Sequence, residues 1–208
     1  MSNVCPLYAH LKDRLAELSQ KFLDDQIANE NADPIGFQPD FDRLAAFRLL
    51  MHAEIEDFLE RKAKENLSAI ASTMAEQKSL IAFPELFSIA AALQRPIGNS
   101  DIFDLVIFKS EVAALINCAR KVIAENNGIK QNSFNALSVF AGKSIDQVDS
   151  TLSASLNSYG KDRGEVAHQS AVRARSMNAP SAELSSAQNL VTELGNYFRA
   201  IVSAEEQT

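Results

Sequence analysis

The sequence predicts an all-α protein, a helical bundle of about five or six helices. The 208 residues include only 7 Gly and 6 Pro, fewer than the many turns of a β-sandwich or barrel need. Apolar residues make up 46% of the chain and aromatic residues only 7%, with no Trp. These apolar residues recur at three- and four-residue intervals, and no segment alternates convincingly at a period of two, so helix is favoured throughout.

The first helix is expected over residues 5–29, because leucines recur there on one helical face up to Phe22 and Leu23. Residues 29–40, which contain two prolines, a glycine and four Asn or Asp residues, predict a loop. We therefore divide the chain into an N-terminal helix and loop, residues 1–36, and a helical domain, residues 37–208.

A long helix is expected over residues 40–75, capped by Asp40 or Asp42. Its buried stripe would consist of Leu44, Phe47, Met51, Ile55, Phe58 and Leu59. Pro84 predicts the start of a short helix that ends by Pro96. The next helix is expected over residues 100–125 with Ser100 as its cap. Its core face would contain Phe103, Val106, Ile107, Val112, Leu115, Ile116 and Val122.

Residues 125–132 predict a turn with Gly128 in the C′ position, and a short helix over 134–140 that stops at Gly142. Ser144 is expected to cap a helix that runs toward Tyr159 and is interrupted at Gly160 and Gly164. A last helix is expected after Pro180, capped by Ser181. Its apolar stripe would contain Leu184, Ala187, Leu190, Val191, Leu194 and Phe198.

The charge and the apolar pattern exclude several classes of protein. The net charge of -7 argues against indiscriminate binding to nucleic acid. No stretch approaches the roughly 18 uncharged apolar residues of a membrane span, and no secretory signal follows the first Met. We therefore expect a cytoplasmic protein in which Cys5 and Cys118 are free thiols.

A local excess of positive charge stands out in this acidic chain. Residues 161–175 carry Lys161, Arg163, Arg173 and Arg175 against Asp162 and Glu165. This stretch surrounds His168, one of three histidines in the chain. A histidine titrates near neutral pH and can transfer protons, while the guanidinium of an arginine binds phosphoryl oxygens through its forked donors. By themselves Arg163 and His168 are a weak signal, because an arginine and a histidine five residues apart occur by chance in many proteins.

The Arg163–His168 motif resembles that of the HEPN superfamily (higher eukaryotes and prokaryotes nucleotide-binding domain), whose ribonucleases carry Arg, four to six residues, then His. The helix with His52, Ala53, Glu56 and Leu59 resembles the long early helix of HEPN proteins of the RiboL-PSP type. The segment 125–168 resembles their Asn-x-Gly-Ile segment and motif helix, and residues 183–202 resemble their closing helix. The similarity spans roughly residues 40–204.

This resemblance implies an up-and-down bundle with an extra N-terminal helix, and a metal-independent endoribonuclease. Arg163 would stabilise the phosphoryl transition state, and His168 would be the acid and base. No metal or other cofactor is needed, because the ribose 2′-OH is an internal nucleophile. The family also implies a homodimer whose RNA site combines both chains, in a toxin or defence effector with an inhibitory, antitoxin-like partner. A composite site suits the motif, because helical positions five apart lie about 140° apart.

Other residues are candidates for supporting roles, and most of them also have a simpler structural interpretation. Glu165 would orient His168. His52 and Glu56 would support the active groove, or form a buried pair near the motif helix; with no third ligand in view, we do not expect them to bind metal. Arg48 would join that support, or form a structural ion pair. Three basic residues would contact the RNA backbone or remain solvated charges: Lys161, Arg173 and Arg175.

Two alternative functions remain open. Gly164 follows Arg163 where many catalytic members have a polar residue. Together with the net acidity, this favours a non-catalytic HEPN-like module that binds RNA, a nucleotide or a protein partner. The second alternative is a helical scaffold in which Arg163 and His168 are structural residues. The first predicts binding without strand scission, and the second predicts that His168→Ala mainly lowers stability.

Overall fold

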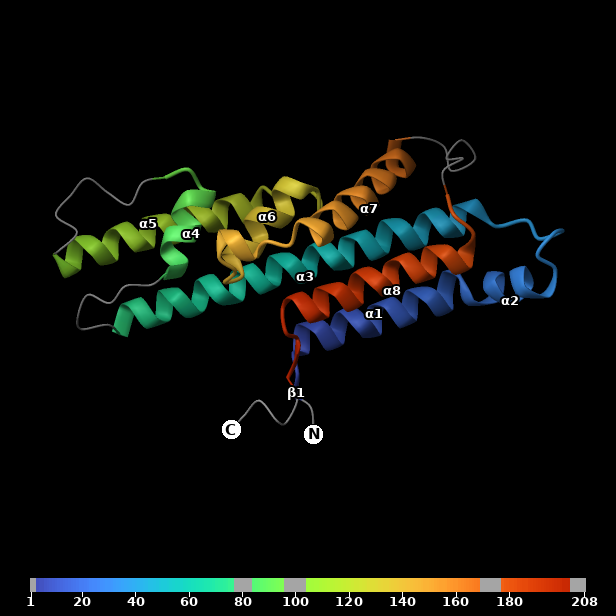
Figure 1. Cartoon of the computed structure of the whole chain (residues 1–208), viewed down its shortest axis with the longest axis horizontal. Helices are drawn as coiled ribbons and strands as arrows, with labels where there is room; N and C mark the ends of the chain where they lie inside the picture. The colour runs from blue at the N-terminus through green and yellow to red at the C-terminus, as the bar shows by residue number, and fades with distance from the viewer. Residues whose placement is uncertain (1–2, 77–83, 96–103, 169–176, 203–208) are drawn as a thin grey trace. The chain divides into compact units, whose positions relative to one another are not determined.

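The computed structural model describes residues 3–76, 84–95, 104–168 and 177–202, and the side chains of residues 3, 162–168, 201 and 202 lie outside this description (Figure 1). The described chain is all-α, as predicted, apart from a two-residue antiparallel strand pair, β1 (Asn3–Val4) with β2 (Ile201–Val202). Its helices are α1 (Pro6–Phe22), α2 (Asp24–Ala32), α3 (Phe41–Glu76), α4 (Pro84–Ala92), α5 (Leu105–Ala124), α6 (Gln131–Phe140), the 3-10 helix η1 (Ile145–Gln147), α7 (Ser150–His168) and α8 (Pro180–Tyr197).

The chain divides into two compact units. The first contains α1, α2, α3 up to Phe58, residues 128–130, α7 from Ala154 and α8. The second contains α3 from Leu59, α4, α5, α6 and η1. The predicted boundary between residues 36 and 37 falls inside the first unit, because α1 and α2 pack against α8 there.

The prediction of one helix over residues 5–29 is wrong. The helix breaks at Leu23, whose side chain is fully buried, and α2 begins at Asp24. The break brings the Asp24 carboxylate to the Ser19 hydroxyl, which donates a 2.6 Å hydrogen bond to it. It also places Asp24 and Asp25 in the first turn of α2, where the helix dipole favours negative charge. The leucine spacing continues across the break, so it did not indicate one.

Helix α3 follows its predicted pattern. The carboxylate of Asp40 accepts hydrogen bonds of 3.1 Å from the backbone N–H groups of Asp42 and Arg43, which identifies it as the cap. All six residues of the predicted stripe are buried: Leu44, Phe47, Met51, Ile55, Phe58 and Leu59. The amphipathic period of this helix therefore determined its orientation.

Helix α5 begins later than predicted. Asp104 is its N-cap and accepts from the N–H groups of Val106 and Ile107, whereas Ser100 and Phe103 lie outside the described residues. The buried face contains Val112, Leu115, Ile116, Ala119 and Ile123. The prediction that Val106 and Val122 belong to the core is wrong, since they are 76% and 41% exposed. Ala119 and Ile123 define which side of α5 is buried, and both valines lie away from that side.

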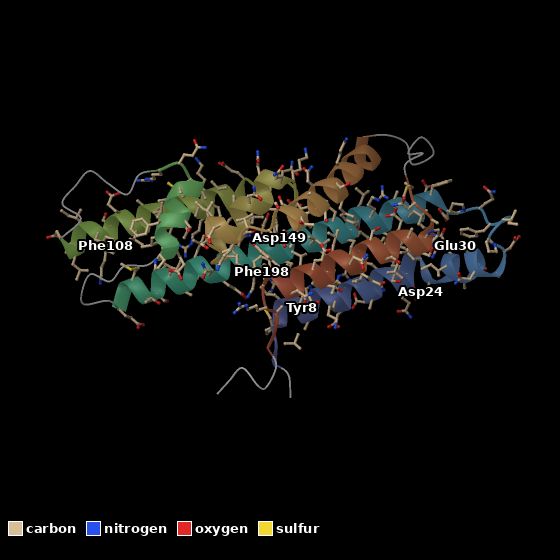
Figure 2. The ribbon with its side chains drawn as sticks, in the orientation of Figure 1. Tyr8, Asp24, Glu30, Phe108, Asp149 and Phe198 are labelled. Atoms are coloured by element: carbon tan, nitrogen blue, oxygen red, sulfur yellow. The ribbon has the colours of Figure 1, made fainter. Side chains whose placement is uncertain are left out.

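The turns before α7 also differ in detail. Gly128 has a φ of 111°, but α5 ends with Glu125 as C-cap, so Gly128 lies beyond the C′ position. Gly142, with a φ of 94°, follows α6 as predicted. Ser144 caps η1, not α7. The cap of α7 is Asp149, which accepts from Thr151 and Leu152 N–H at 2.8 and 3.0 Å (Figure 2).

Helix α7 continues through Gly160 and Gly164, so the predicted interruption there is wrong. Tertiary packing outweighs the weak helix preference of glycine, which is roughly 1 kcal/mol below alanine.

Helix α8 has Pro180 at its first position and Ala179 as N-cap, so Ser181 is not the cap. Ser181 instead donates to the carboxylate of Glu30 (Figure 2) through its hydroxyl, at 2.8 Å, and its N–H, at 3.1 Å. Four members of the α8 stripe are buried: Ala187, Leu190, Val191 and Leu194.

Among the described residues, no helix combines the length and the apolar character that crossing a membrane requires.

Candidate functional site

Arg163, Glu165 and His168 all belong to the last turns of α7, the orange helix in Figure 1. Their side chains lie outside the described residues, as do Arg173 and Arg175. The side chain of Lys161, in the same helix, is exposed. Because α7 is a continuous helix, Arg163 and His168 occupy positions about 140° apart around its axis and about 7.5 Å apart along it.

His52 of α3 packs against the motif-bearing helix. The imidazole is only 1% exposed. A Cβ atom added at Gly160 of α7 would lie 3.5 Å from His52 Nε2, and one added at Gly128 would lie 3.8 Å from His52 Cε1. The imidazole therefore lies within ordinary van der Waals reach of both glycine positions. Gly160 is one helical turn before Arg163, so the contact fixes how the motif-bearing end of α7 approaches α3.

Glu56 holds the turn at Gly128 against the same face of α3. Its Oε1 accepts a hydrogen bond from the backbone N–H of Gly128, and its Oε2 lies 3.8 Å from Nδ1 of His52. The carboxylate is thus directed to the backbone of the turn and to the imidazole. No group of three or more His, Cys, Asp and Glu side chains suitable for a metal ion occurs among the residues that the structure describes.

Arg48 forms a buried ion pair with Glu183 of α8. Its Nε donates to Oε2 at 3.0 Å and its Nη2 donates to Oε1, while both residues are only 1% exposed. The N–H of Asn178 also donates to Oε1, at 3.0 Å. Nη1 of Arg48 is buried without a hydrogen-bond partner among the described residues. The structural interpretation of Arg48 therefore holds, and its guanidinium ties α3 to the first turn of α8.

The pairing of Glu183 with Arg48 was not predicted from the sequence. An acidic residue in the first turn after Pro180 has the ordinary signature of a helix N-terminus, where it is favoured by the dipole. Nothing in its local pattern indicates burial. Glu183 is buried because α8 packs against α3, which brings it to Arg48, a residue 135 positions away in the sequence.

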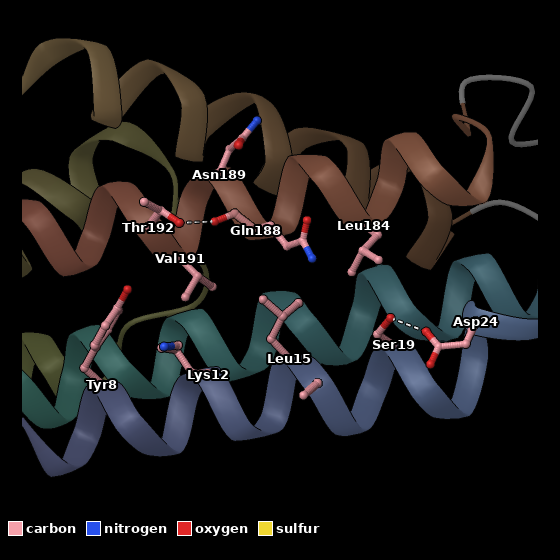
Figure 3. A pocket seen from close by; sticks show the side chains of 11 residues that line it. Tyr8, Lys12, Leu15, Ser19, Asp24, Leu184, Gln188, Asn189, Val191 and Thr192 are labelled. Atoms are coloured by element: carbon pink, nitrogen blue, oxygen red, sulfur yellow. Dashed lines mark hydrogen bonds between the residues drawn. The ribbon is translucent and has the colours of Figure 1, made fainter. Parts of the chain in front are cut away.

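Two hollows flank α8 in the first unit. A small one of about 270 Å³ lies between α7 and α8 and is lined by Ser155, Ser158 and Tyr159 of α7 with Ser186 and Glu193 of α8. Its polar wall ends one turn before Arg163. A larger, open groove of about 660 Å³ lies between α1 and α8 (Figure 3). Sequence patterns had indicated neither hollow.

In comparisons with known proteins, no protein-family model, curated protein or solved structure matches this chain. The functional conclusion therefore depends on the motif and on the geometry around α7.

Proposed function

We propose that this protein is a metal-independent endoribonuclease whose active groups are Arg163 and His168. The observation that carries the proposal is the Arg-x4-His motif, in a locally basic stretch of an acidic chain, on a single uninterrupted helix. His168 removes the proton from a ribose 2′-OH and delivers one to the leaving 5′-oxygen. Arg163 stabilises the negative charge on the phosphoryl oxygens. The products are a 2′,3′-cyclic phosphate and a 5′-hydroxyl.

The continuity of α7 supports a site composed of two chains. Because the two positions are about 140° apart on one helix, Arg163 and His168 of a single copy belong to different sides of α7. In a homodimer, Arg163 of one copy faces His168 of its partner across the bound RNA strand. Glu165 orients His168, while Lys161, Arg173 and Arg175 contact the RNA backbone.

The buried contacts of α3 with Gly160 of α7 and with the turn at Gly128 support the same proposal. Catalytic groups work best on rigid elements whose supporting residues are themselves locked by packing. His52 against Gly160, and Glu56 on the N–H of Gly128, hold α7 and the turn at residues 128–130 on α3. These residues support the site without touching RNA. The hollow beside Ser158 provides a polar recess next to the motif.

The test is cleavage of a fluorescent single-stranded RNA by the full chain in excess EDTA. We expect cleavage to survive chelation, and His168→Ala and Arg163→Ala to lower the rate constant by about 10²–10³-fold. His10→Ala and Arg120→Ala are matched controls, since both residues are exposed and lie outside α7. Rates that are equal in wild type and His168→Ala, or lost on chelation, contradict the proposal.

The second candidate is a non-catalytic module, favoured by Gly164 after Arg163 and by the net charge of -7. It predicts that RNA or a nucleotide binds in a manner sensitive to Arg163→Ala, while the RNA stays intact. Fluorescence anisotropy combined with gel analysis of the same samples separates the two functions. An inhibitory, antitoxin-like partner and a cytoplasmic location remain predictions from the sequence.

A further inference from the structure

The groove between α1 and α8 has the charge pattern of a surface that binds a copy of itself. It is open, has a volume of about 660 Å³, and follows the two helices along their length (Figure 3). Its lining carries two charges, Lys12 near the middle of α1 and Asp24 at the start of α2. Between them the lining is neutral and mixes Leu15, Ala16 and Val191 with amide and hydroxyl side chains.

Both charges lack a partner of opposite sign among the described residues. Lys12 makes no hydrogen bond or ion pair with them. The carboxylate of Asp24 accepts one hydrogen bond from them, which the Ser19 hydroxyl donates at 2.6 Å. Arg14 on the same helix, by contrast, pairs with both Glu17 and Glu54. Within the part of the chain that the structure describes, the groove therefore presents a free cation and a free carboxylate with neutral residues between them.

The separation of the two charges excludes an ordinary small metabolite that bridges both. From Lys12 to Phe22, the last residue of α1, the helix rises about 15 Å, and Asp24 lies farther along. A span of this length fits a helix lying in the groove. The best-matched helix carries a carboxylate opposite Lys12, an ammonium opposite Asp24, and neutral residues between them.

We propose that this helix is α1 of a second copy, packed antiparallel. In a two-fold arrangement Lys12 of each copy lies opposite Asp24 of the other, so a single surface satisfies both charges twice. Each α1 then occupies the groove between α1 and α8 of the other copy, as in a four-helix bundle. Ala16, which is small and exposed, lies near the middle of this span and allows the two α1 helices to approach closely.

The overall charge of the chain favours this surface for self-association. Two copies that each carry a net charge of -7 repel one another over most of their surfaces. The charges of Lys12 and Asp24 in the groove lining balance, so this surface adds no net charge of its own to that repulsion. It lies on the α1 side of α8, and the hollow beside α7 lies on the other flank of that helix. The contact is thus additional to the one that the proposed nuclease site uses, and it does not depend on that activity.

The test is the molar mass of the full chain by light scattering or sedimentation, with charge reversals. Lys12→Asp and Asp24→Lys each weaken self-association about tenfold or more and halve the mass near the dissociation constant of the wild type. An equimolar mixture of the two variants recovers the wild-type mass, because the carboxylate introduced at position 12 of one chain then meets the ammonium introduced at position 24 of the other. The double reversal in one chain recovers it as well.

Controls separate this charge pairing from general effects. Lys21→Asp and Asp13→Lys make the same charge changes at exposed positions of α1 outside the groove, and they keep the wild-type mass. If Asp24→Lys disturbs folding, Asp24→Asn, whose amide oxygen still accepts from Ser19, gives a smaller weakening. A monomeric wild type, unchanged mass in the single reversals, or a mixture that does not reassociate overturns the inference. RNA cleavage plays no part in these outcomes.

Discussion

At Gly195, the absence of a side chain lets α8 approach Tyr8 of α1. A Cβ atom at this position would overlap with Cζ and Oη of Tyr8, whose ring is buried. The same ring packs edge-on to Phe58 of α3, at a centroid distance of 6.4 Å, and Phe58 packs similarly to Phe198. The ring therefore has little freedom to move aside.

We predict that Gly195→Ala destabilises the protein by about 1–3 kcal/mol, because overpacking outweighs the gain of roughly 1 kcal/mol in helix preference. Urea unfolding followed by circular dichroism measures this free energy. Tyr8→Leu should remove the overlap, so that adding Gly195→Ala to it costs much less than in the wild-type background. Equal costs in both backgrounds would show that the overlap is not the cause.

At the scale of elements, two ion pairs of different kinds connect the helices of the first unit. Arg43 of α3 binds the exposed carboxylate of Asp25 in α2 through two hydrogen bonds of 2.6 and 2.7 Å. Arg48, one and a half turns later in α3, binds Glu183 of α8 in the core. Solvent screens the first pair, whereas the second is shielded from it.

The buried pair predicts an asymmetric response to mutation. Arg48→Met leaves the Glu183 carboxylate buried without its partner and should cost about 3–5 kcal/mol of unfolding free energy. The double variant Arg48→Met with Glu183→Leu removes both charges and should be more stable than Arg48→Met alone. Denaturant unfolding of both variants checks this order, and the reverse order would contradict the role of the charge.

The surface pair predicts a pH dependence. The Arg43 guanidinium, chiefly through its hydrogen bonds, lowers the pKa of Asp25 below its ordinary value. A carboxyl whose pKa is lower in the folded state stabilises the fold above its unfolded pKa, and that contribution is lost as the pH falls through the folded pKa. Asp25→Asn should therefore be slightly less stable than wild type at pH 7, and the difference should shrink below about pH 4.

Unfolding curves of Asp25→Asn and of Asp13→Asn at several pH values measure this contribution. Asp13 is an exposed residue of α1 without a described partner, so its variant should follow the wild type at every pH. A stability difference for Asp25→Asn that grows toward low pH would contradict the sign of the effect.

At the scale of the whole molecule, the proposed nuclease requires two chains for one site. Mixing Arg163→Ala with His168→Ala then restores cleavage, because one site of each mixed dimer combines an intact arginine with an intact histidine. After random exchange, half of the dimers are mixed and each has one intact site, so about a quarter of the wild-type activity should return. Activity in the mixture no higher than in the separate variants would contradict a composite site.

The candidate site was predictable from sequence only in part. The motif in α7 and the amphipathic face of α3 are local patterns, so Arg163, His168 and the core position of Met51 beside His52 follow from spacing. Whether Arg163 and His168 act stays a prediction. The partners of Arg48 and His52 did not follow from sequence, because Glu183, Gly128 and Gly160 lie far from them along the chain.

The sequence by itself determined the all-α class, the phase of α3 and the choice of Asp40 or Asp42 as its cap, since these depend on residues within a few turns of one another. Only the tertiary structure decided that the helix breaks at Leu23, that α7 runs through its glycines, and that Arg48 is neutralised in the core. The physical reason is that packing between distant segments contributes more free energy than local helix preference. A buried leucine at the break and an imidazole seated on Gly160 therefore override what the neighbouring residues favour.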